Sequence, residues 1–291
     1  FSRDATKPNA RVVQIGDNDS GRLFKFNPSE VDLDHQSLIA AIGALINDDT
    51  APTIESHIIT MLSGGRTLQL AMPPAPVRSV ERATGETSNP GRQVETQIQL
   101  PDAGVLDDLS AIAYPDFGLF IWKSARVFLS IRCGAIGQNG RGGHAHNDQL
   151  SIELNIDGED WLADPGSYVY TADPKRRDAY RSVMAHAAPR VGTSEPAGLN
   201  LGMFRLQDNA QAQCLEFGAN TFEGRHLGFG APTHRGIKIE NGAVRIRDSF
   251  GGALDWQAEA ETTIITSAEA LRRHFAMTLP FSPGYGSLDE A

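Results

Sequence analysis

Residues 142–166 read GGHAHNDQLSIELNIDGEDWLADPG, and this stretch decides the fold of the chain. Two glycines and two histidines come first, apolar and polar residues then alternate, and the stretch ends in Asp-Pro-Gly. Asp157 and Gly158 separate two alternating runs, which is a strong signal for a β-hairpin. The sequence therefore predicts two antiparallel strands, with His144 and His146 where a glycine-rich loop becomes the first strand.

Further short runs with the same alternation lie on both sides of this hairpin. Turn signals such as IENGA divide them. Strands at such close and even spacing favour an antiparallel sandwich over a parallel sheet. The expected additional strands are ETQIQL, FGLFIWKS, RVFLSIRC, AQCLEFG, HRGIKIENG, AVRIRDSF and ETTIITS.

Residues 32–62 have a different character and predict two helices. Apolar residues from Leu38 to Ile46 recur at helical spacing, and residues 49–52 break the pattern. Asp34 and Thr53 are placed to cap the two helices. A stretch rich in proline, serine and glycine follows at 72–93 and indicates a linker or an extended edge. The expected fold class is mainly β: an antiparallel β-sandwich preceded by a short α-helical segment.

Composition limits the classes of function. The chain has 291 residues, of which 40% are hydrophobic and 21% charged, which is ordinary for a globular protein. Its formal net charge of -10 and the lack of a basic stretch argue against a general nucleic-acid binder. No apolar run reaches the length that a membrane helix needs, so no membrane partner is expected. Cys133 and Cys214 lie far apart in sequence and are interpreted as buried free thiols.

The histidine pair is the main chemical signal. Residues i and i+2 of a strand share a face, so His144 and His146 can converge on a metal ion, a sugar, or one of each. Asp164 and His186 add a carboxylate and a third imidazole, which completes a ligand set of the zinc type. A structural hydrogen-bond cluster accounts for the same residues, because hairpin register cannot be read from sequence. Asp148 is an alternative as a carboxylate that orients an imidazole.

Residues 168–181 have the polarity of a sugar-binding site. Tyrosines can stack on sugar rings and arginines can pair with carboxylate or sulfate groups, although a solvated turn explains the same composition. A second basic patch lies at 234–235. GDNDSG at 16–21 lacks the spacing of an EF-hand and is interpreted as a capped turn. The candidate substrate-binding residues are Tyr168, Tyr170, Arg177, Arg181, His234 and Arg235.

Residues 142–191 resemble the core motif of the heparinase II/III-like polysaccharide lyases, with GHxHxDxLS, DPG, YTxDxxxRxxxRS and AHxxxxV in order. The resemblance implies a helical (α/α) toroid followed by an antiparallel sandwich. Residues 1–75 would then be the end of the toroid and residues 76–291 the sandwich. It also implies that His144 is the catalytic histidine that faces the substrate. His146, Asp164 and His186 would hold a structural Zn²⁺.

The activity implied by the resemblance is that of a carbon–oxygen lyase. Such an enzyme cleaves an acidic, uronic-acid-containing polysaccharide, such as a glycosaminoglycan or an alginate, by β-elimination. Its catalytic tyrosine belongs to the toroid, which should precede Phe1. We therefore expect the 291-residue chain alone to have little or no activity and to need the missing helical toroid as its partner. The resemblance also implies a periplasmic or secreted location, and the sequence is compatible with a homodimer.

Two other classes fit the residues. A cupin-like metal enzyme also uses an HxH pair, a carboxylate and a later histidine on a β-rich scaffold, but keeps open positions on iron or manganese. A non-catalytic carbohydrate-binding sandwich needs only the tyrosine and arginine cluster. Redox-active iron would favour the first, and sugar binding that survives the loss of His144 would favour the second.

Overall fold

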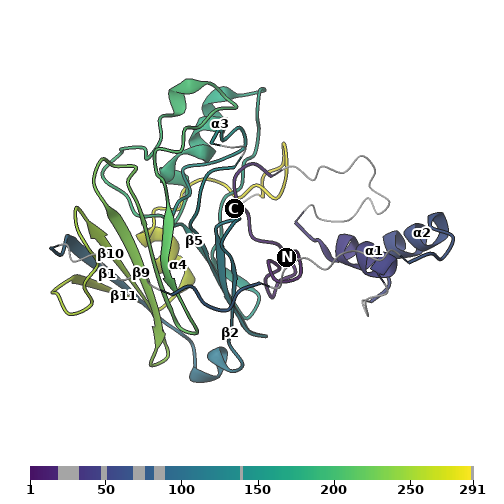
Figure 1. The fold of residues 1–291 in the computed structure, drawn as a ribbon, viewed down its shortest axis with the longest axis horizontal. Helices are drawn as coiled ribbons and strands as arrows, with labels where there is room; N and C mark the ends of the chain where they lie inside the picture. The colour runs from purple at the N-terminus through teal and green to yellow at the C-terminus, as the bar shows by residue number, and fades with distance from the viewer. Residues whose placement is uncertain (19–32, 47–50, 68–75, 82–88, 138–139, 290–291) are drawn as a thin grey trace.

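The computed structural model describes residues 1–18, 33–46, 51–67, 76–81, 89–137 and 140–289, and two β-sheets lie face to face in it (Figure 1). The first sheet is antiparallel and has the strand order β2-β3-β4-β5-β6. Its strands are β2 (Ser110–Tyr114), β3 (Leu119–Lys123), β4 (Val127–Arg132), β5 (Ile152–Ile156) and β6 (Glu159–Leu162).

The second sheet has the order β11-β1-β10-β9-β8-β7. All of its neighbours are antiparallel except β1 and β11, which are parallel. Its strands are β1 (Arg92–Gln99), β7 (Gln213–Phe217), β8 (Thr221–His226), β9 (Thr233–Glu240), β10 (Ala243–Phe250) and β11 (Glu261–Ile265).

The main hydrophobic core lies between the two sheets. Both contribute alternate residues, for example Leu129 from β4 and Ile237 from β9. α4 (Ala268–His274) lies beside β6 and adds Leu271 to this core. Because successive strand residues point to opposite faces, the neighbours of Leu129 must be covered from the other side of the sheet. Phe128, for example, is fully buried and belongs to a second cluster.

Residues 1–18 supply that second cover. Ala5 is part of the cluster around Phe128, and Val13 and Ile15 pack against it. The buried ammonium group of Lys7 lies 2.9 Å from Glu153 of β5 and 3.1 Å from Asp160 of β6. The N-terminal segment is thereby fixed across the outer face of the five-stranded sheet, and it runs toward the end of the sheet where β5 begins.

Two helices confirm the expected helical segment. They are α1 (Gln36–Ile46) and α2 (Ile54–Leu62), and in Figure 1 they extend to the side of the sandwich. Asp34 accepts a hydrogen bond from the backbone N–H of Gln36 at 2.8 Å, and Thr53 forms a capping box with Ser56. The division of the chain at residues 75 and 76 stays a prediction. Within the first part, residues 1–18 lie on the sandwich and also contact the segment that leads into α1, where the N–H of Val12 donates to the carbonyl of Leu33 at 2.9 Å.

All nine expected strands form, and the structure adds two that the sequence analysis did not identify, β2 and β8. The β5–β6 hairpin turns at Asp157 and Gly158, both with positive φ, as the Asp-Gly signal predicts. α3 (Pro174–Arg181) and three short 3₁₀ helices (Ala103–Leu106, Val183–Ala185 and Leu199–Leu201) complete the described elements. Among the described residues, no helix is both long enough and apolar enough to cross a membrane.

Candidate functional site

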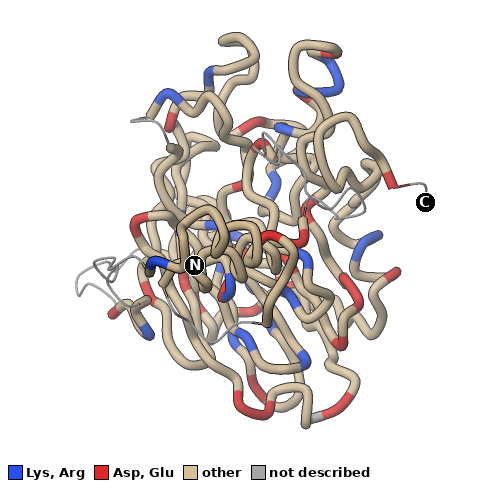
Figure 2. Tube along the Cα trace, turned by 90° about the vertical axis from the view of Figure 1, so that its right-hand side faces the viewer, with Lys and Arg blue, Asp and Glu red and all other residues tan. Residues whose placement is uncertain are grey.

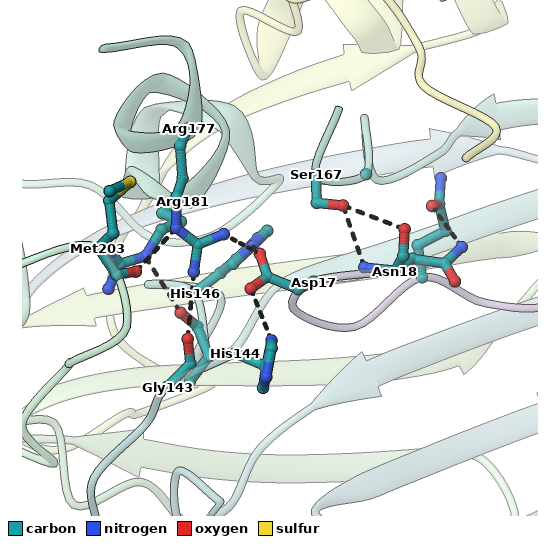
Figure 3. Close-up of polar contacts among 12 residues, drawn as sticks. Asp17, Asn18, Gly143, His144, His146, Ser167, Arg177, Arg181 and Met203 are labelled. Atoms are coloured by element: carbon teal, nitrogen blue, oxygen red, sulfur yellow. Dashed lines mark hydrogen bonds and ion pairs between the residues drawn. The ribbon is translucent and has the colours of Figure 1, made fainter. Parts of the chain in front are cut away.

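The two histidines of the HxH pair lie in a loop, and the expectation that they open a strand is wrong. β5 begins only at Ile152, after a turn in which Leu150 has a positive φ. The backbone N–H of Ser151 donates to the carbonyl of Asp148 in this turn. His144 and His146 nevertheless converge, and the group that joins them is the carboxylate of Asp17 (Figure 3).

Asp17 accepts three hydrogen bonds from side chains and is buried. Its Oδ2 lies 3.0 Å from Nδ1 of His144, and its Oδ1 lies 3.0 Å from Nε2 of His146 and 2.6 Å from Nη1 of Arg177. Burial alone would raise the pKa of Asp17, but the hydrogen bonds from His146 and Arg177 outweigh it and lower the pKa to about 2. Asp17 is therefore a carboxylate that can only accept, and both imidazoles must donate to it.

The backbone next to Asp17 holds the two segments together. The N–H of Asp17 donates to the carbonyl of His144 at 2.8 Å. Gly16 has φ of +64°, and a Cβ at this position would lie 2.4 Å from the same carbonyl oxygen. Only glycine fits this close approach. The N–H of Asn18 donates to Oγ of Ser167, in the loop that follows Asp-Pro-Gly. The interpretation of GDNDSG as a mere capped turn missed this role, and residues 19–21 of that motif lie outside the described residues.

α3 positions Arg177 and Arg181, and both guanidinium groups are fully buried. Asp173 caps the helix and Pro174 occupies its first turn, as expected for a helix start. Arg177 donates to the carbonyls of Met203 at 2.7 Å and Gly143 at 3.1 Å, in addition to Asp17. Arg181 donates to carbonyls of residues 145 and 205. As they lie, these arginines hold the histidine loop and do not reach the surface, so a direct contact with substrate stays a prediction.

An aromatic wall borders the exposed imidazole of His144. The side chain of His144 is 55% exposed. The ring of Tyr170 lies 6.1 Å from it and the ring of Phe204 lies 5.9 Å from it, between ring centroids. Tyr285 continues the wall, 5.0 Å from Tyr170. Phe204 and Tyr285 are each 46% exposed. The wall thus offers flat apolar rings beside a polar imidazole, which suits a sugar ring. Phe204 was not singled out from the sequence.

Tyr168, a second predicted sugar-binding residue, packs against Tyr180 and Arg176. Its ring is 5.9 Å from Tyr180, and the guanidinium of Arg176 lies 5.2 Å from its centroid. Tyr168 is half-buried, while Arg176 is exposed. Its role in substrate binding stays a prediction.

The predicted zinc ligands meet at the same end of the sandwich. The rings of His146 and His186 are 5.4 Å apart. Nδ1 of His186 lies 2.5 Å from Oδ2 of Asp164, whose Oδ1 accepts from the N–H of Gly166. Asp164 therefore stands behind His186. Among the described residues, no group of three or more His, Cys, Asp or Glu side chains has the geometry to hold a metal ion.

Two imidazole nitrogens at this place suit a metal. Nδ1 of His146 and Nε2 of His186 are buried and have no hydrogen-bond partner among the described residues. Donation to Asp17 through Nε2 leaves Nδ1 of a neutral His146 with a lone pair, and buried acceptors without donors are costly. Burial alone would lower the pKa of His186, but the carboxylate of Asp164 more than offsets it and raises the pKa. The residues fit a two-nitrogen site with an orienting carboxylate.

Asp148, the other carboxylate considered from the sequence, has different contacts. One of its oxygens lies 4.0 Å from Nε of Arg132, and Gln149 donates to the same oxygen at 3.4 Å. The carboxylates that contact imidazoles of the motif are thus Asp17 and Asp164.

His234 and Arg235 of β9, predicted to bind substrate, lie inside the sandwich. Nδ1 of His234 lies 3.3 Å from Glu223. Arg235 is fully buried and makes a bidentate pair with Asp248 of β10, at 2.7 Å for both bonds. It also donates to the carbonyls of Leu150 and Ala187, at 2.7 and 2.6 Å. Arg235 therefore ties the six-stranded sheet to the segments that carry His146 and His186, and a direct role with substrate stays a prediction.

The fold and site define a two-sheet sandwich with a histidine-bearing loop at one end. The family model described as "Heparinase II/III-like, C-terminal" matches residues 107–277, which is more than half of the chain. The chain belongs to this family. Asp17 lies outside the matched residues.

Solved structures give further similarities. The crystal structure of heparan sulfate lyase HepC from Pedobacter heparinus is 14% identical, with 86% of this chain and 31% of that chain covered and a TM-score of 0.44. The crystal structure of heparinase III is 16% identical, with 50% of this chain and 23% of that chain covered and a TM-score of 0.40. The chain thus spans less than a third of either protein. A comparison with curated proteins gives no match.

Proposed function

We propose that this chain is the sandwich part of a polysaccharide lyase that cleaves a uronic-acid-containing polysaccharide by β-elimination. One observation carries the proposal most directly. In a family of heparinase-like domains, His144 presents an exposed imidazole beside an aromatic wall, while a buried carboxylate holds its Nδ1. Membership in the family favours this reading over a cupin-like enzyme.

The chemistry sets the demands on the site. A base removes the proton at C5 of the uronate, and the electron pair of the C5–H bond forms the C4–C5 double bond. The C4–oxygen bond breaks, and its electron pair leaves with the oxygen. The leaving oxygen takes up a proton. Negative charge builds on the uronate carboxylate as the C5 proton departs, so a hydrogen-bond donor or cation must already lie against it.

His144 can meet these demands through Nε2, since its Nδ1 faces Asp17. Unprotonated, Nε2 accepts a proton, and protonated, it donates to the uronate carboxylate. Tyr170 and Phe204 would stack on the sugar and keep water away from the reacting carboxylate. Lys175 and Arg176, both exposed on α3, add positive charge on a chain that is acidic as a whole (Figure 2 shows both signs interspersed along the trace).

The catalytic tyrosine of the proposal would come from a helical domain of the same protein. The test compares this chain with a form that also carries that domain, on heparan, alginate and bacterial exopolysaccharide preparations, by the absorbance of the unsaturated product. We expect the product from the longer form with at least one substrate, and little from this chain alone. A fully active chain, or a longer form that cleaves no polyuronate, would contradict the proposal. A periplasmic or exported location is proposed with it.

Zinc is proposed as a structural ion of the same site. Nδ1 of His146 and Nε2 of His186 would bind the ion. Asp164 would either orient His186 or serve as a third ligand. When bound, the ion would supply no step of the elimination and would only fix the histidine loop.

The zinc proposal is tested by titration of the dialysed chain with ZnCl₂, followed by calorimetry and thermal unfolding. We expect binding and a raised Tm, both lost in His186→Ala. The matched control is His57→Ala, since His57 is exposed on α2, and this variant should respond to zinc as the unchanged chain does. Binding that His186→Ala leaves intact would contradict the proposed ligands, and tight iron with redox activity would favour the cupin-like alternative.

A further inference from the structure

Asp17 is the one buried carboxylate among the described residues that touches both histidines of the HxH pair, and nothing in the motif around those histidines announces it. It lies 127 residues before His144 in sequence. The contact exists because residues 1–18 cross the outer face of the five-stranded sheet and end beside the histidine loop.

We infer that Asp17 is the positioning residue of His144: it fixes the Nδ1–H tautomer and so leaves Nε2 as the atom that meets the substrate. The inference rests on the proposed function for its catalytic consequence only. The tautomer itself is a property of the folded chain. A carboxylate accepts hydrogen bonds and cannot donate them, so an imidazole that lies 3.0 Å away must turn an N–H toward it.

The orientation of the Asp17 carboxylate is itself fixed. Oδ1 receives the two donors Nη1 of Arg177 and Nε2 of His146, while Oδ2 receives His144. Arg177 in turn donates to the carbonyls of Met203 and Gly143. Its Cζ lies 5.0 Å from the ring centroid of Tyr170 and 4.8 Å from that of Phe204. The carboxylate therefore cannot rotate without breaking a buried ion pair.

This asymmetry gives Asp17→Asn a defined effect. Arg177 and His146 still donate to the Oδ1 side, so the amide oxygen of Asn stays there and the amide NH₂ replaces Oδ2. The NH₂ group is a donor, so Nδ1 of His144 must become the acceptor and the proton moves to Nε2. His146 keeps its donor and its tautomer. Both histidines contact the side chain of residue 17, but only the tautomer of His144 should change.

The test is the tautomer of each histidine, read from long-range ¹H–¹⁵N correlations of the ¹⁵N-labelled, metal-free chain. We expect Nδ1–H for His144 and Nε2–H for His146 in the unchanged chain, and a switch of His144 alone in Asp17→Asn. Asp164→Asn is the matched control at His186, and it should leave His144 unchanged. If His144 carries its proton on Nε2 in the unchanged chain, the inference fails, even where the variant does not fold.

Turnover supplies the second reading. In a form with the helical domain, Asp17→Asn should lower kcat roughly 10- to 100-fold with little change in KM, because the substrate contacts remain while His144 presents the wrong atom. Asp157→Asn, at the exposed hairpin turn, is the matched control and should keep the original rate. An unchanged kcat in Asp17→Asn would overturn the positioning role. A tautomer switch without any lyase activity in any form would instead remove the proposed function and leave the tautomer assignment standing.

Discussion

Two fully buried arginines, Arg177 and Arg235, are bound in closely similar ways and yet face different tasks. Each pairs with one aspartate, donates to two backbone carbonyls and stacks on at least one aromatic ring. Asp17, the partner of Arg177, also receives two histidines, whereas Asp248 receives only Arg235 in a bidentate pair among the described residues. The same kind of ion pair thus stabilises the interior at Arg235, whereas at Arg177 it supports His144, the exposed catalytic candidate.

The largest effect is expected at the interior pair. Arg235→Met should lower the free energy of unfolding by about 3–5 kcal/mol, since it leaves Asp248 as a buried charge without its partner. The carbonyls of Leu150 and Ala187 lose their donor as well. Urea unfolding of the chain measures this. A loss of unfolding free energy below about 1 kcal/mol would show that Arg235 does not hold the segments of Leu150 and Ala187 against the six-stranded sheet.

Arg177→Met sharpens the comparison. Asp17 would keep two imidazole donors in this variant, so we expect a smaller loss of unfolding free energy than in Arg235→Met. The turnover of a form with the helical domain should nevertheless fall, because Asp17 loses the group that orients it. Equal destabilisation in the two variants would contradict the distinction between the clusters.

The next effect is a pH dependence at His226, which lies near Arg235. Burial first, and then the charge of Arg235, lower its pKa from 6.5 to about 4. The folded state thus binds fewer protons than the unfolded state between these values, so stability falls as the pH falls from 6.5 toward 4. The loss amounts to at most about 3 kcal/mol.

His226→Asn isolates this contribution. Its amide oxygen can accept the hydrogen bond that Nδ1 of His226 accepts from the N–H of Gly228 at 3.1 Å. Urea unfolding at pH 7.5 and pH 5 should show a smaller loss on acidification for the variant than for the unchanged chain. The same loss in both would mean that His226 takes up a proton equally in the folded and unfolded states, so that its pKa is not lowered by folding.

The smallest effect is expected at the exposed surface near the histidine loop. Arg176 is exposed on α3, beside Tyr168. Arg176→Ala should leave the unfolding free energy unchanged and raise KM for an anionic polysaccharide only a few-fold, since an exposed ion pair contributes about 0.2–1 kcal/mol. The rise should shrink at high salt. A large fall in kcat would instead place Arg176 at the reacting carboxylate.

The sequence predicted most of the sandwich because its strands carry strong local signals. The Asp157–Gly158 turn and the alternating runs beside it were sufficient for the central hairpin. β8 was missed because Glu223, Gly224 and Arg225 interrupt its apolar pattern. The burial of Glu223 and Gly224 against neighbouring strands depends on tertiary contacts, which no local pattern contains.

The site was predicted less completely. The motif identified the histidines and Asp164, and the family match supports the lyase class. The loop position of the histidines and the burial of Arg177, Arg181 and Arg235 were not foreseen, because arginines near tyrosines indicate a binding surface as readily as an interior clamp. Asp17 gave only a turn signal, since its partners lie more than a hundred residues away.

The most direct test of the central claim is the rate of unsaturated product formation by His144→Ala in a form that carries the helical domain. His144 is 55% exposed and Asp17 keeps Arg177 and His146 as donors, so the variant should stay folded and lose only the roughly 1–2 kcal/mol of one hydrogen bond to Asp17. We predict a rate about 10²- to 10⁴-fold below that of the unchanged protein. A variant that forms the unsaturated product at the original rate would contradict the account.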